Sequence, residues 1–129
     1  MNDELWVKFF KTAVKVLGPG NYTEYTSDSW CAWTTFDTLE CTIHYWRAGI
    51  PDEKYVEATY INEGPWTQPF SYRSLAHIII PKTFAWESTI NGEYRYGRKH
   101  QDIATLSNEL DKAGIIHRLT PILLEIKLY

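Results

Sequence analysis

The chain has 129 residues and a formal net charge of −3, and 16% of its residues are aromatic, including six Trp and nine Tyr. This length and composition predict one globular domain, 1–129, with a sizeable core, and exclude a disordered chain. No apolar run approaches the roughly 20 residues that a membrane-spanning helix needs. The first residues, Asn2, Asp3 and Glu4, are not typical of a secretory signal, so we expect a cytoplasmic protein without membrane contact.

Three segments have the spacing of apolar residues that is typical of amphipathic helices. The first covers about 3–17, with Asn2 as its cap and Gly18-Pro19 as its end. The second covers about 29–48 and the third about 102–113. The second and third end in similar sequences, RAGI (47–50) and KAGI (112–115), in which the glycine is expected to stop the helix in the left-handed conformation.

The other segments predict strands, in the order 54–61, 75–80, 83–90, 93–97, 115–119 and 122–129. Asn91-Gly92 predicts a tight hairpin between the third and the fourth. In the last segment four residues alternate toward one buried face: Ile122, Leu124, Ile126 and Leu128. Consecutive strands joined by short turns predict an α+β fold, a mostly antiparallel sheet with about three helices packed on it.

The stretch CAWTTFDTLECTIH (31–44) contains both cysteines and one of the four histidines. If it belongs to one helix, the two cysteines lie about 15 Å apart along the axis, too far for a disulfide or a shared metal. We therefore predict two free thiols. Cys41 and His44 are three residues apart and are compatible with a catalytic dyad, but we favour a structural helix with a charged outer surface.

The other histidines, His77, His100 and His117, have no partner at a spacing typical of metal sites, and we predict neither catalytic residues, metal nor cofactor. YRYGRKH (94–100) mixes aromatic and basic residues, as nucleic-acid interfaces do. Charged edge hairpins have the same composition, and the net charge of −3 predicts weak affinity for nucleic acid.

Residues 18–63 contain eight acidic residues against two basic ones, and this segment is the candidate partner-binding surface. Trp66 lies in the long connection 62–74, where aromatic residues are expected either to anchor a partner or to cover the edge of the core. The predicted partner-binding residues are Asp37, Glu40, Asp52, Glu53, Glu57, Glu63 and Trp66.

From about Gly64 onward, an aromatic loop, an apolar strand, a polar hairpin, a helix ending before GI, and the closing strands HRL and LLEIKLY follow one another. This order resembles that of small bacterial domains of unknown function found beside toxin genes and taken to be immunity proteins. The resemblance covers about half of the chain, contains no diagnostic motif and transfers no functional residue. It implies a small, cytoplasmic, often acidic protein without catalytic activity.

The sequence therefore favours a non-catalytic protein that neutralises a protein partner, an immunity protein for a cationic toxin domain such as a nuclease. Two alternatives stay open. One is a small enzyme that uses histidine, cysteine and carboxylate chemistry, and the other is a phage-encoded inhibitor of a host defence system. The sequence does not determine the oligomeric state.

Overall fold

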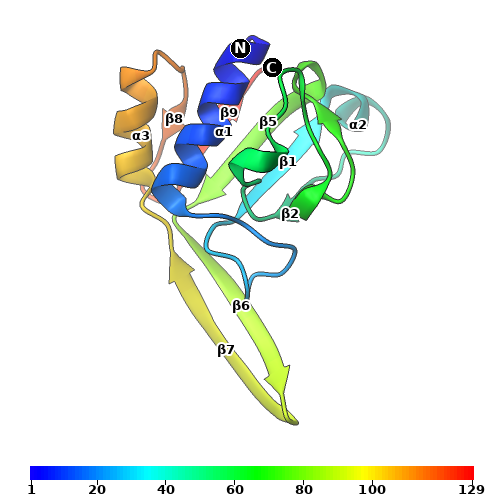
Figure 1. Cartoon of the computed structure of the whole chain (residues 1–129), viewed down its shortest axis with the longest axis vertical. Helices are drawn as coiled ribbons and strands as arrows, with labels where there is room; N and C mark the ends of the chain where they lie inside the picture. The colour runs from blue at the N-terminus through cyan, green and yellow to red at the C-terminus, as the bar shows by residue number, and fades with distance from the viewer.

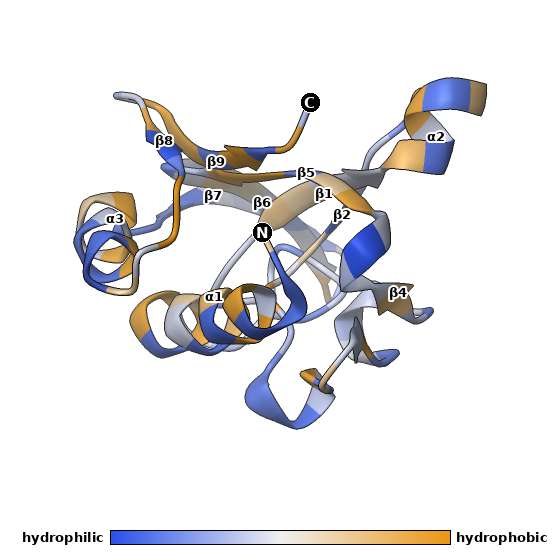
Figure 2. Cartoon of the chain, turned by 90° about the horizontal axis from the view of Figure 1, so that it is seen from above, coloured by the Kyte–Doolittle hydropathy of each residue, from blue (hydrophilic) through white to orange (hydrophobic).

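A five-stranded antiparallel sheet with the strand order β2-β1-β5-β9-β8 forms the centre of the molecule, in a computed structural model that describes residues 1–129. Helices α1 (Asp3–Leu17) and α3 (Ile103–Lys112) lie on one side of this sheet (Figure 2). The hairpin of β6 (Thr83–Ile90) and β7 (Glu93–His100) projects away from it (Figure 1). The sheet strands are β1 (Cys31–Thr35), β2 (Trp46–Ala48), β5 (Leu75–Pro81), β8 (Arg118–Leu119) and β9 (Leu123–Lys127).

The predicted α+β class is confirmed, and so are the first and third helices, α1 (Asp3–Leu17) and α3 (Ile103–Lys112). Asn2 caps α1, where its side chain accepts a hydrogen bond from the N–H of Leu5 at 2.8 Å. Gly114, after α3, has the left-handed φ of 73° that the KAGI sequence predicts. No helix is long and apolar enough to cross a bilayer.

The predicted helix over 29–48 is wrong, because this segment forms β1, the short helix α2 (Phe36–Cys41) and β2. Aromatic and β-branched residues, including Trp33 and Thr34, favour a strand, and Trp33 alternates into the core. Thr35 then caps α2 by accepting a hydrogen bond from the N–H of Thr38. The RAGI sequence therefore ends a strand and not a helix.

The strand predicted over 54–61 is also wrong for most of its length. The Asp52 side chain accepts a hydrogen bond from the N–H of Glu53 and begins a 3-10 turn, η1 (Glu53–Tyr55). The one strand there is β3 (Tyr60–Ile61), which pairs with β4 (Phe70–Ser71), and Val56 forms an isolated antiparallel bridge with Ile61. Two further 3-10 turns flank β4, η2 (Gly64–Trp66) and η3 (Tyr72–Ser74).

The core lies between the sheet and the helices α1 and α3. Its largest fully buried side chains include Trp6, Phe9, Phe10, Trp33, Trp66 and Tyr72. The final strand contributes Leu124 and Ile126 to this core, but Ile122, predicted on the same buried face, precedes the strand and is 70% exposed. Most of the Trp and Phe side chains are thus inside the molecule, whereas Tyr72 is the one buried tyrosine.

Two glycines far apart in sequence bring their backbones into direct contact. The N–H of Gly20 donates to the carbonyl of Ile50 at 2.9 Å, and the N–H of Gly49 donates to the carbonyl of Asn21 at 3.0 Å. A Cβ on either glycine would overlap the backbone of the opposite segment. Glycine is therefore required at both positions, and the contact holds the connection between α1 and β1 against the end of β2.

Candidate functional site

The predicted hairpin of β6 (Thr83–Ile90) and β7 (Glu93–His100) is confirmed, with a second strand that continues beyond the predicted 93–97, and forms a narrow arm. Asn91 and Gly92 have φ values of 53° and 76°, as a two-residue type I′ turn requires. Trp86 pairs with Gly97 across the strands, and a Cβ on Gly97 would touch the indole ring. Figure 1 shows the arm extending well beyond the rest of the molecule.

One face of the arm is attached to the body through its base. Phe84 stacks on Trp30 with ring centroids 5.9 Å apart, and Trp86 lies 5.0 Å from the ring of Tyr25. The Lys99 ammonium donates to the carbonyls of Tyr25 and Ser27 at 2.7 and 2.8 Å. These contacts fix the direction in which the arm projects, since they join both of its strands to the segment that precedes β1.

The opposite face of the arm is open to solvent. Tyr94 and Tyr96 are 59% and 77% exposed, and their ring centroids are 5.9 Å apart. The Tyr94 hydroxyl donates to the Glu87 carboxylate at 2.8 Å, and this hydrogen bond raises the pKa of Tyr94. With Arg98, these side chains line a shallow hollow of about 550 Å³. This face combines fixed aromatic surface with charged groups of both signs.

A second arrangement lies on the face of the main sheet that points away from α1 and α3. Buried His77 contacts the Tyr45 hydroxyl through Nδ1 at 2.9 Å and Glu125 through Nε2 at 3.3 Å. The Tyr129 hydroxyl lies 3.3 Å from that of Tyr45, and Arg118 pairs with Glu125 at 3.4 Å. Burial, followed by the neighbouring Tyr129, raises the pKa of Tyr45 to about 12.

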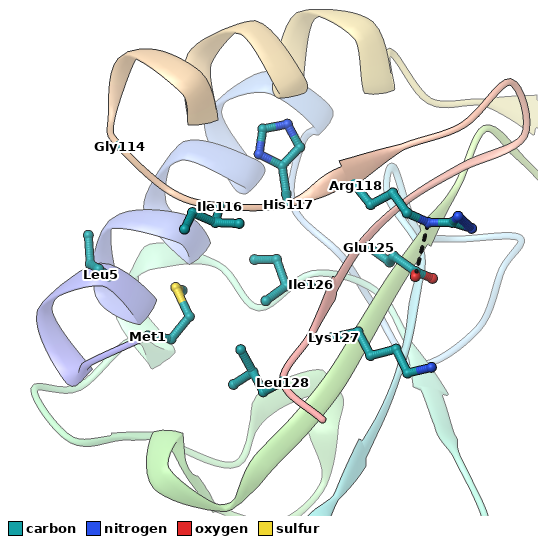
Figure 3. A pocket seen from close by; sticks show the side chains of 10 residues that line it. All are labelled: Met1, Leu5, Gly114, Ile116, His117, Arg118, Glu125, Ile126, Lys127 and Leu128. Carbon is teal, nitrogen blue, oxygen red and sulfur yellow. Dashed lines mark ion pairs between the residues drawn. The ribbon is translucent and has the colours of Figure 1, made fainter.

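A third feature is a groove of about 430 Å³ between the start of α1, the segment after α3, and β9. Figure 3 shows the apolar side chains of Met1, Leu5, Ile116, Ile126 and Leu128 around it. The charged side chains of Arg118, Glu125 and Lys127 point away from it (Figure 3). The groove is therefore lined mainly by aliphatic groups.

The acidic residues predicted to form one binding surface are divided between two places. Asp37 and Glu40 are exposed on α2, which lies beyond the end of β1 and on the other side of the sheet from α1 (Figure 2). The remaining acids follow β2, on the side of α1, where Glu53 pairs with Lys11 at 3.7 Å. These remaining acids are Asp52, Glu53, Glu57 and Glu63.

The structure corrects the interpretation of Trp66 as a possible partner anchor. Its side chain is 1% exposed, and its indole N–H donates to the carbonyl of Gly49 at 3.2 Å. Phe70 and Tyr72 of the same connection are also buried. These aromatic residues cover the core, which was the other interpretation of this segment.

Both cysteines are free, as predicted, although the helix on which that prediction rested does not form. Cys31 is buried in β1, and burial raises the pKa of its thiol, whereas Cys41 is exposed at the end of α2. His44 lies beyond α2, where it contacts the Thr42 hydroxyl at 3.2 Å and the ring of Trp46. No three histidine, cysteine or carboxylate side chains come together in a group that would hold a metal ion.

Comparison with known proteins gives no match: no family model, no curated protein and no solved structure matches the chain. Function must therefore be inferred from the three features themselves. The sequence indicated the arm through Asn91-Gly92 and YRYGRKH, but sequence reasoning missed the groove and the His77 arrangement. Two sequence features could have indicated the His77 arrangement. Glu125, Lys127 and Tyr129 alternate with aliphatic residues and so share one face of the last strand, and a histidine stands inside an otherwise apolar strand.

Proposed function

We propose that this chain is a non-catalytic binding protein that neutralises a protein partner, in the manner of an immunity protein. The observation that carries the proposal is the arm, with Tyr94 and Tyr96 exposed side by side on one face. Tyr and Arg are enriched among the residues that dominate binding energy at protein interfaces. Exposed aromatic rings on a fixed support are suited to such contacts because little side-chain entropy is lost on binding.

The shape of the arm favours neutralisation over simple association. Eight-residue strands span about 27 Å, and a two-stranded ribbon is narrow enough to enter a cleft that a flat surface cannot enter. An isolated hairpin is only marginally stable in water, so the attachment of its base to Tyr25 and Trp30 is important. An arm that fills the cleft of a toxin domain would exclude that domain's substrate.

The charge of the partner is a separate part of the proposal. The acids Asp52, Glu53, Glu57 and Glu63 lie along one connection and would attract a cationic partner such as a nuclease domain. The arm itself carries Arg95, Arg98 and Lys99 against Glu87 and Glu93, and does not by itself favour a basic target. A phage-encoded inhibitor of a host defence system would use the same surfaces.

A second candidate is a small enzyme, and the contacts of His77 with Glu125 and Tyr45 favour it. A histidine between a carboxylate and a hydroxyl is an arrangement used in general acid–base catalysis. His77 is buried, however, and does not line the groove. The groove is lined by a different histidine, His117, whose side chain is 5% exposed. A catalytic role would require substrate to reach a side chain that is covered here.

The test is co-expression with the C-terminal domain encoded by the gene immediately upstream. We expect that domain to arrest growth, and we expect the intact chain to restore growth and to co-purify with it. Tyr94→Thr with Tyr96→Thr, which keeps residues favourable for strands, should abolish rescue. Ser88→Thr with Ile90→Thr, on the other face of the same arm, should retain it.

Two results would count against the proposal. An upstream domain that has no toxicity would contradict the immunity role. Rescue that survives the double tyrosine variant but is lost in Tyr45→Phe and Glu125→Gln, with unchanged melting temperatures, would favour the enzyme.

A further inference from the structure

The strand β9 has an open backbone edge beside the groove. β8 pairs with β9 over only two residues, Arg118 with Glu125 and Leu119 with Leu124. The N–H of Leu128 donates to the carbonyl of Ala76 in β5 at 2.9 Å. Because backbone groups alternate in direction along a strand, the N–H and C=O of Lys127 point to the opposite edge. They form no hydrogen bond with any other group of the chain.

The edge is open because the chain before β8 is held elsewhere. If the ladder continued, Ile116 would lie opposite Lys127, two residues beyond the Arg118–Glu125 pair. Instead the His117 ring contacts the Ser107 hydroxyl of α3 at 2.7 Å and the carbonyl of Ile115 at 2.8 Å. These contacts keep the segment on α3. The opening is therefore part of the folded structure and not a frayed strand end.

The groove provides an apolar surface next to this edge. Ile116 is 89% exposed at its rim, and Leu5, Ile126 and Leu128 line it from α1 and β9 (Figure 3). An unpaired strand edge is a template for pairing with another chain, and a contiguous exposed apolar surface is typical of an interaction site. Together they match the two requirements for strand addition, which are main-chain hydrogen bonds and pockets for alternate side chains.

We propose that an extended segment of a partner polypeptide adds to the edge of β9 at Lys127 and continues the line of β8. Every second side chain of that segment then enters the groove and must be aliphatic. The side chains between them emerge beside Lys127 and Arg118 on the other face. Acidic residues are favoured there because Lys127 has no carboxylate partner: its ammonium lies over the Tyr129 ring, 4.7 Å from the centroid, whereas Arg118 already pairs with Glu125. The ligand class is therefore a strand of alternating aliphatic and acidic residues.

This site is distinct from the arm, since the two lie at opposite ends of the molecule in Figure 1. If no strand binds at β9, the proposed neutralising role of the arm is unaffected. A second copy of this chain is a competing occupant, because two open edges can pair with each other. The test must therefore separate partner binding from self-association.

The probe is an acetylated, amidated peptide of alternating valine and glutamate, titrated into the isotope-labelled protein and followed by amide NMR. We expect saturable shifts at Ile116, Lys127 and Leu128. Methylation of alternate peptide nitrogens, which removes the main-chain donors, should weaken binding at least about tenfold. Replacing glutamate by lysine in the peptide should also weaken it, because like charges then meet Lys127.

Ile116→Glu places a charge at the groove rim and should weaken binding about tenfold or more, because it removes apolar contact. Ile122→Glu is the matched control and should leave binding unchanged. Ile122 is also an exposed isoleucine, but it lies just before β9, at the end of the strand that is far from Lys127. The proposal would be overturned if the methylated peptide bound as tightly as the unmethylated one, or if the Ile116→Glu protein bound the peptide as tightly as the unsubstituted protein. So would binding weaker than about 5 mM. Dimerisation of the free protein through Lys127 would assign the edge to a second copy instead.

Discussion

The indole rings of Trp33 and Trp66 stack in the core, with centroids 3.8 Å apart and planes 10° from parallel. The pair joins the central sheet to the long connection between β3 and β5. Phe10 of α1 meets Trp66 edge-on at 5.4 Å, so helix, sheet and connection share one aromatic cluster. Trp66, for which the sequence left open an anchor for a partner or a cover for the core, is thus a principal part of the core.

Trp66→Ala should lower the free energy of unfolding by about 3–5 kcal/mol, because it leaves a cavity beside Trp33. Tyr96→Ala, which removes a 77% exposed ring, should change it by less than about 0.5 kcal/mol. Urea denaturation measures both. A Trp66→Ala protein of unchanged stability would show that the stack contributes little to the fold.

The two thiols should differ sharply in reactivity. Cys31 is buried and its thiol pKa is raised by loss of hydration, whereas Cys41 is exposed. Labelling with an alkylating reagent followed by mass spectrometry should therefore add one group to the folded protein, at Cys41, and two to the denatured protein. Rapid labelling of Cys31 under native conditions would mean that β1 opens readily.

Leu124→Ala should destabilise the protein by about 2–5 kcal/mol, because its side chain is fully buried in β9. Ile122→Ala provides the comparison and should cost less than about 0.5 kcal/mol, since this side chain is 70% exposed. Deleting residues 120–129 removes β9, which pairs with both β5 and β8, and should unfold the chain. A truncated protein that melts cooperatively would contradict the integral role of this strand.

Alkaline pH should destabilise the protein through Tyr45. Its pKa is about 12 in the folded state against an ordinary value of 10.0, so the stabilisation is complete below pH 10 and is lost as pH rises to about 12. Tyr45→Phe cannot ionise, and its melting temperature should fall less over that interval than that of the unsubstituted protein. Equal losses in the two proteins would place the titration of Tyr45 near its ordinary value.

Charge reversal tests which acidic group contacts a basic partner. Glu53→Lys with Glu63→Lys should slow association strongly at low salt and much less at high salt, because complementary charge acts mainly on the association rate. Asp37→Lys with Glu40→Lys is the matched pair on α2, on the other side of the sheet. Stopped-flow binding to the purified partner measures both. A larger effect from the α2 pair would move the interface to that side.

The sequence is sufficient to predict the elements whose signal is local. Asn2 and Gly18 bound α1, and Asn91-Gly92 fixes the register of the arm. The segment 29–48 was misassigned because Ala32, Phe36, Leu39, Ile43 and Trp46 happen to have helical spacing. The competing preference of Trp33 and Thr34 for a strand is decided by pairing with β5, a contact over forty residues away in sequence.

The candidate surfaces depend on long-range contacts to an even greater degree. The His77 arrangement joins three segments, β5 with His77, the residue before β2, Tyr45, and the C-terminal segment with Glu125 and Tyr129, and no local spacing indicates that these segments meet. The acidic residues were expected to form one patch because a continuous helix would have placed Asp37 and Glu40 next to the turn after it. Because the segment forms β1, α2 and the edge strand β2 instead, the two groups of acidic residues are separated.

The backbone contact between Gly20 and Gly49 also constrains how such sequences can diverge. Neither position tolerates a side chain, and a substitution at one cannot be compensated at the other, because each Cβ would overlap the main chain of the opposite segment. At Gly49 the Cβ would also meet the Ser27 hydroxyl. Surface loops and the exposed residues of the arm carry no comparable restriction. A distant relative that shares few other identities should therefore still have glycine at both positions. This pair of glycines is a more selective criterion for recognising such a relative than overall sequence similarity.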